Sequence, residues 1–120
     1  MTKDNGFIAI SVYTSEDAVE DGILVDLATI DPKWEKGLFR YVTTNLLSRG
    51  YMNGSAINVV NLVDLLNQAL QIVKKRSHDF TDPMESFYDG DIELPSGSQQ
   101  SIFIEMNEHE KYTILLPEDH

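Results

Sequence analysis

The sequence contains no cysteine, and only three of its 120 residues are histidine. The lack of cysteine excludes a disulfide framework, a thiolate zinc site, an iron–sulfur cluster and a cysteine nucleophile. No apolar run approaches the length of about 18 residues that a membrane span needs, and the N-terminus shows no signal-peptide core. We therefore expect a single cytoplasmic domain over residues 1–120.

Basic residues are scarce as well. Nine Lys and Arg stand against twenty Asp and Glu, and the formal net charge is −11. From Asp79 onward the chain has eleven acidic residues and one basic residue, Lys111. Direct binding of nucleic acid and of anionic membranes is therefore disfavoured, because both need a Lys/Arg surface. A basic protein partner fits this charge, and solubility alone is the other explanation.

Catalytic and metal-binding motifs are also missing from the sequence. His78, His109 and His120 have no partner at metal-ligand spacing, and His109 is expected in a solvated hairpin turn. No calcium-loop, phosphate-loop, dinucleotide or nucleophile-elbow pattern occurs. We expect no cofactor, no metal and no enzymatic activity.

What is present predicts an α+β fold, with helices first and a sheet last. The apolar run 7–13 predicts a short N-terminal strand, and Thr14–Asp17 predicts the start of a short helix that ends at Asp21-Gly22. A brief strand is expected over 23–27. Asp31-Pro32, followed by apolar residues at helical spacing, predicts a helix over about 33–49.

The second main helix has the clearest pattern, over about 58–76. Its apolar residues follow the i, i+3, i+4, i+7 spacing throughout. Beyond it, the alternation over 87–94, 101–106 and 111–116 predicts a three-stranded antiparallel meander. We expect the long helix to pack on the apolar face of this meander.

The other face of the meander carries the main candidate site. Alternation places Asp89, Asp91 and Glu93 together on one strand face, and Glu105 on the neighbouring strand extends the row. Such a row of carboxylates could bind a basic protein in place of a nucleic-acid backbone. An ordinary solvated outer face is the alternative interpretation.

Both ends of the chain resemble one family of proteins. Residues Ile10–Asp26 contain Y-T, a short helix with alanine and then D-G-x-L-V-D, and Tyr112–Asp119 reads Y-T-I-L-L-P-E-D. These segments resemble a family of small uncharacterised proteins carried by phages, plasmids and other bacterial mobile elements. The segment Ile30–Ser55 departs from it. The resemblance implies an accessory protein of a mobile element in a bacterial host. It assigns no catalytic or binding residue to this chain.

The leading hypothesis is thus a non-enzymatic binding protein, with an anti-defence role against a nuclease or CRISPR effector as its sharpest form. A second hypothesis is a ligand site or enzyme centred on Tyr13, Asp21 and Asp26, because an aspartate in an apolar strand needs a polar partner. A third is a self-associating structural protein, such as a homodimer, because the apolar stripe of the long helix is wide.

Overall fold

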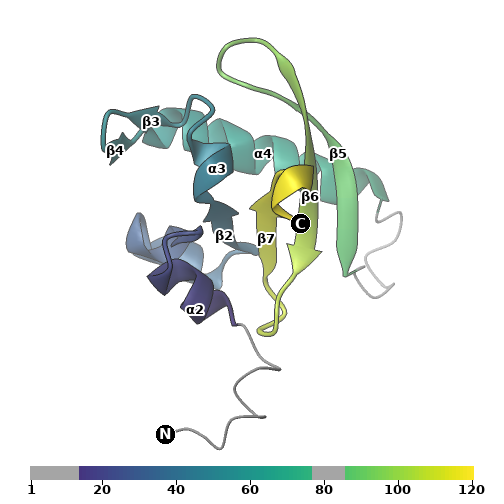
Figure 1. Ribbon diagram of the computed structural model, residues 1–120. Coiled ribbons are helices and arrows are strands. Elements are labelled where there is room, and N and C mark those ends of the chain that lie inside the picture. Colours follow the sequence, from purple (N-terminus) through teal and green to yellow (C-terminus); the bar gives the residue numbers. More distant parts are fainter. Residues whose placement is uncertain (1–13, 77–85) are drawn as a thin grey trace, which may run out of the picture.

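Five strands form one mixed, mainly antiparallel sheet with the order β1-β2-β7-β6-β5 (Figure 1). The computed structural model describes residues 14–76 and 86–120. The strands are β1 (Leu24–Asp26), β2 (Phe39–Thr43), β5 (Phe87–Glu93), β6 (Gln99–Met106) and β7 (Tyr112–Leu115). Only β2 and β7 pair in parallel among these neighbours. The α+β class is therefore as predicted, but two strands from the N-terminal half join the predicted meander.

The helices are of very different lengths. They are α2 (Ser15–Glu20), α3 (Thr44–Leu47) and α4 (Val59–Arg76), with three short 3₁₀ turns, η1 (Leu27–Thr29), η2 (Pro32–Lys36) and η3 (Pro117–Asp119). A separate small hairpin, β3 (Met52–Asn53) and β4 (Ala56–Ile57), leads into α4. Among the described residues no helix is both long and apolar enough to cross a membrane.

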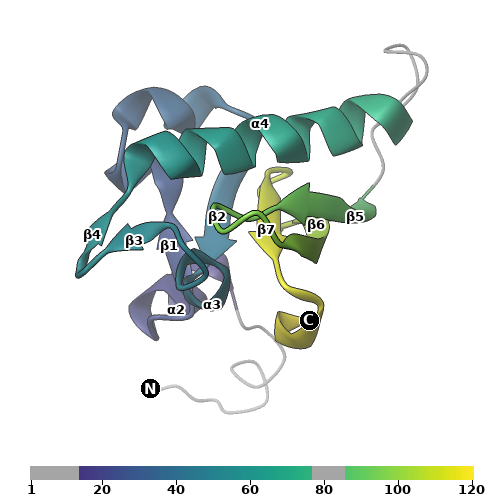
Figure 2. The same cartoon turned by 90° about the horizontal axis from the view of Figure 1, so that it is seen from above.

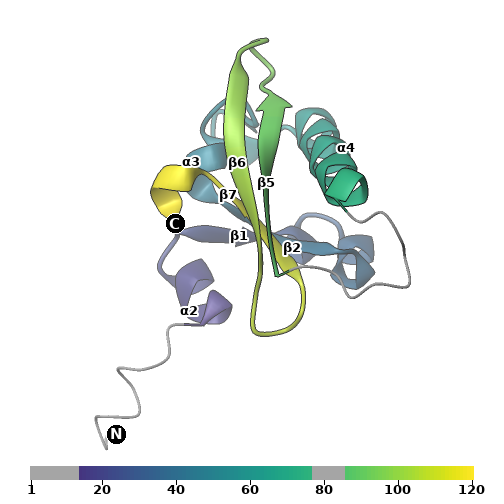
Figure 3. The ribbon, with the colours of Figure 1, turned by 90° about the vertical axis from the view of Figure 1, so that its right-hand side faces the viewer.

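The long helix α4 covers one face of the sheet, whereas α2 and η3 lie on the opposite side (Figures 2 and 3). Its core-facing side chains are buried in one cluster with inward-facing residues of the strands; they are Leu62, Leu65, Ala69 and Val73. Gly90 of β5 allows a close approach, because a Cβ built there would lie 2.8 Å from Cδ1 of Ile72. Helix α4 therefore packs on the sheet through these side chains.

Burial alternates along β5 and β6, whereas in β7 the adjacent residues Ile114 and Leu115 are both buried. Tyr88 and Ile92 of β5 are buried beneath α4, and Ile102 and Ile104 of β6 continue the same core. The intervening residues of β5 face the other way and are exposed. On that outer face α2 contacts β1 and η3 contacts β6, whereas the outer-face residues of β5 are exposed.

Capping residues lie at both ends of α2 and at the start of α4. Thr14 and Asp17 make a capping box at the start of α2, and Gly22 follows that helix with φ +79°, a value that favours glycine. Asn58 caps α4 by accepting a hydrogen bond from the Asn61 N–H at 3.1 Å. The predicted strand over 7–13 lies outside the described residues.

The predicted helix over about 33–49 is wrong. This segment forms η2, β2 and α3 instead. The spacing of Trp34, Leu38 and Leu46 fits a helix, but Phe39–Thr43 is rich in aromatic and β-branched residues that suit a strand. Strand β2 then gains neighbours on both sides, β1 and β7, and it is buried at four of its five positions. This pairing outweighs the local helical spacing.

Candidate functional site

The outer face of β5 carries the predicted row of carboxylates. Asp89, Asp91 and Glu93 are all exposed on the edge strand of the sheet. Same-face residues of a strand lie about 6.6–6.8 Å apart, so the row is regular. Neither β5 nor β6 contains a Lys or Arg residue. The negative charge of this strand face is thus not neutralised from within its own hairpin.

Neutral donors from β6 hold the middle of the row. Ser101 lies opposite Asp91 in the register, and its hydroxyl donates to Asp91 Oδ1 at 2.8 Å. Gln99 Nε2 donates to Asp91 Oδ2 at 3.3 Å. These contacts orient the carboxylate while leaving its charge in place.

Glu105 does not extend the row in line. It lies opposite Phe87, at the far end from Glu93, and its Oε2 is 2.6 Å from Nε2 of His120. The His120 ring makes edge-to-face contacts with Phe87 and Phe103. Glu105 therefore belongs to an aromatic cluster. No local sequence pattern predicts this cluster, because His120 reaches it from the end of η3.

A shallow hollow of about 450 Å³ joins the row to this aromatic cluster. Asp89 and Asp91 line one side, Ser101 and Phe103 the next strand, and Pro117 of η3 the far side. Two carboxylates beside a phenyl ring are the groups that bind an arginine or lysine side chain, because the ring attracts the cation and the apolar stem packs on it.

The edge of β5 is partly closed by a side chain of α4. The Gln68 amide donates to the Glu93 carbonyl at 3.0 Å and accepts from the Glu93 N–H at 2.8 Å. Charged residues on an edge strand also oppose pairing with another sheet. Edge protection is therefore a structural role for the same row.

Asp26, the candidate at the N-terminal half, forms an ion pair with Arg40. Asp26 Oδ1 lies 2.7 Å from Arg40 Nε and Oδ2 lies 3.0 Å from Arg40 Nη2. Asp26 also caps η1 by accepting from the Ala28 N–H at 2.9 Å. The polar partner that an aspartate in an apolar strand needs is thus Arg40. The wrong prediction of a helix over 33–49 did not indicate this contact.

The ion pair predicts a specific dependence of stability on pH. The Arg40 hydrogen bond lowers the pKa of Asp26 against the opposing effect of burial, and the Ala28 hydrogen bond lowers it further. A carboxylate with a lowered pKa stabilises the fold above its unfolded-state pKa of about 3.9, and the stabilisation is lost as the pH falls through the folded value. The difference in free energy of unfolding between the natural chain and Asp26→Asn should therefore shrink between pH 7 and pH 3 in urea titrations. A constant difference would contradict this role.

Of the other two residues of that candidate site, the structure describes Asp21 but not Tyr13. Asp21 lies at the C-terminal end of α2, and Tyr13 lies outside the described residues. A hollow of about 340 Å³ lies nearby between α2 and the strands β6 and β7, but neither Asp21 nor Asp26 lines it. A site formed jointly by the three residues stays a prediction.

Three valines of α4 remain exposed near its first turn: Val59 at 47%, Val60 at 80% and Val63 at 41%. The wide apolar stripe of this helix is therefore covered by the sheet over most of its length but not at its start. This patch is the place at which the self-association hypothesis would apply.

Comparisons with protein-family models, with curated proteins and with solved structures return no match.

Proposed function

We propose that this chain is a non-enzymatic binding protein whose outer β5–β6 face contacts a basic partner protein in the bacterial cytoplasm. The observation that carries the proposal is the hollow in which Asp89 and Asp91 stand beside Phe103. Its chemistry fits an arginine or lysine side chain of the partner, and Glu93 extends the negative charge along the strand.

The sharper form of the proposal concerns the kind of partner. A row of carboxylates about 6.6–6.8 Å apart can occupy a basic groove that otherwise holds phosphates. A nuclease or a CRISPR effector of a bacterial host has such a groove, and an accessory protein of a mobile element that fills it would act against host defence. The mimicking surface consists of the three carboxylates of β5, and Glu105 lies on β6 beside His120.

The test is affinity capture from a bacterial lysate with the natural chain and the variant Asp89→Asn/Asp91→Asn/Glu93→Gln. We expect the natural chain to retain a basic protein and the variant to bind it at least about tenfold more weakly, a loss of about 1.4 kcal/mol. Capture should also weaken with added salt, because salt screens exposed charges. Affinity is then measured with the purified partner.

A matched control separates this surface from the overall charge. Glu20→Gln/Glu35→Gln/Glu110→Gln removes the same formal charge at exposed positions outside β5, and its binding should stay close to that of the natural chain. Equal losses in both triple variants would contradict a specific surface, and equal capture by the natural chain and the β5 variant would refute the proposal. Competition by duplex DNA for the purified partner is expected for the mimic, and its absence would limit the proposal to a basic protein surface of another kind.

A further inference from the structure

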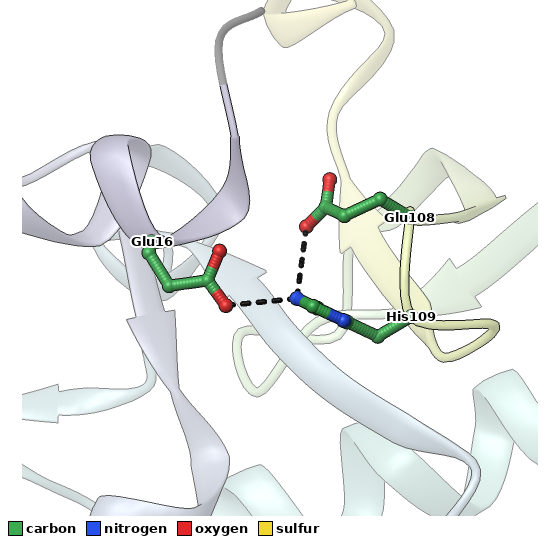
Figure 4. A group of neighbouring side chains, drawn as sticks. All are labelled: Glu16, Glu108 and His109. Carbon is green, nitrogen blue, oxygen red and sulfur yellow. Dashed lines mark hydrogen bonds and ion pairs between the residues drawn. The ribbon is translucent and has the colours of Figure 1, made fainter.

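A second cluster of charged side chains lies outside the β5 hollow, at the turn between β6 and β7. Glu16 projects from the first turn of α2, and Glu108 and His109 project from the turn between β6 and β7 (Figure 4). His109 Nε2 lies 2.8 Å from Glu16 Oε2 and 3.6 Å from Glu108 Oε1. The cluster joins residues 93 positions apart in the sequence, which explains why no motif announced it.

We propose that His109, Glu16 and Glu108 bind one divalent transition-metal ion of the zinc class. One potential ligand atom from each residue lies within 4.8 Å of the others. Ligand atoms about 2.0–2.2 Å from a tetrahedral Zn²⁺ lie about 3.3–3.6 Å from one another. The observed distances of 2.8 Å and 3.6 Å from His109 Nε2, with all three ligand atoms within 4.8 Å of one another, therefore require side-chain shifts of about 1 Å to surround an ion.

The choice of metal follows from the donor atoms. An imidazole nitrogen with two carboxylates suits Zn²⁺ and its neighbours, whereas Ca²⁺ and Mg²⁺ prefer oxygen ligands alone. The ion takes the lone pair of His109 Nε2, so any proton on that nitrogen leaves to solvent. Two carboxylates and one imidazole carry net negative charge in either protonation state of the ring, which a divalent cation offsets.

The backbone around the cluster holds two of the ligands in place. The Ser15 N–H donates to Glu108 Oε1 at 3.2 Å. Asn107 Oδ1 accepts from the His109 and Lys111 N–H groups at 2.8 and 3.0 Å, which fixes the turn that bears both ligands. Such supporting contacts orient metal ligands before the ion arrives.

The electrostatics of Glu108 agree with this geometry. Burial raises its pKa, but hydrogen bonds from the Ser15 side chain and backbone, together with the charge of His109, lower it by more. Glu108 is therefore a carboxylate at neutral pH. The neighbouring hollow between α2 and the strands, which Ser15 and Glu108 also line, gives water access to the remaining coordination position.

The test is calorimetric titration of the full chain with ZnCl₂, in salt of about 0.15 M to screen non-specific attraction to the acidic surface. We expect saturable binding of one ion per chain. Glu16→Gln and His109→Gln should each weaken it at least about tenfold, and MgCl₂ should give no comparable signal. Co²⁺ in place of Zn²⁺ should give visible absorption bands that are lost in His109→Gln.

A second exposed His–Glu pair among the described residues provides a matched control. His120 and Glu105 lie 2.6 Å apart with side-chain exposures of 49% and 45%, close to the 55% of His109. His120→Gln should bind Zn²⁺ as the natural chain does. Zn²⁺ should also raise the thermal unfolding midpoint of the natural chain and of His120→Gln but not of His109→Gln. Absence of saturable binding, or binding that survives His109→Gln, would refute the site.

Discussion

Replacing Leu65 by alanine is expected to lower the free energy of unfolding by about 2–5 kcal/mol. Leu65 has no solvent exposure and belongs to the core between α4 and the sheet. Alanine favours the helix slightly, so the loss comes from the removed side-chain contacts and the cavity left behind. Urea unfolding monitored by circular dichroism gives the value by linear extrapolation.

The same helix provides the control for that experiment. Val60 is 80% exposed on α4, and Val60→Ala should change the free energy of unfolding by no more than about 0.5 kcal/mol. If both variants lost similar amounts, α4 would not be packed on the sheet by the face described. A small loss of free energy of unfolding in both variants would also show that α4 does not pack on the sheet by this face.

Replacing Asp26 by alanine is expected to lower the free energy of unfolding by about 2 kcal/mol at neutral pH. The substitution removes both contacts to Arg40 and leaves the guanidinium, with a side-chain exposure of 28%, without its carboxylate acceptor. It also removes the side-chain cap of η1. Chemical unfolding at neutral pH measures the total loss.

A variant of Asp31 separates the contribution of the Arg40 contacts from that of the helix cap. It caps η2 as Asp26 caps η1, accepting from the Lys33 N–H at 3.0 Å. Asp31→Ala should therefore cost about 1 kcal/mol or less, the effect of a cap alone. A loss in Asp26→Ala no greater than in Asp31→Ala would show that the Arg40 pair adds nothing to stability.

The sequence predicted those elements whose signals are local. Helix α4 has a long apolar stripe, an Asn58 cap and no competing pattern, and each strand of the meander alternates over several residues. The segment of strand β2 was wrongly predicted as a helix, because its residues are buried on both faces and its strand neighbours, β1 and β7, are set by the tertiary fold. A central strand shows a continuous apolar run rather than alternation, and such a run also fits a helix.

The candidate sites likewise divide into features that local sequence patterns predict and contacts that depend on the tertiary fold. The exposure of Asp89, Asp91 and Glu93 follows from alternation and was predictable, as was the need of Asp26 for a polar partner. The identity of Arg40 as that partner depends on the register of β1 against β2, where Asp26 lies opposite Tyr41. The meeting of Glu16 with His109 depends on how α2 docks beside the β6–β7 turn, and no local pattern encodes that.

The position of β7 has a consequence for the order in which the chain can fold. Of the described strands it is the last to be synthesised, yet it lies at the centre of the sheet, between β2 and β6. On a ribosome that makes the chain from its N-terminus, β1–β2 and β5–β6 can form only as separate pairs until Tyr112–Leu115 emerges. A nascent chain halted before this strand holds two unjoined sheet edges, so this sheet cannot be completed until β7 has been synthesised.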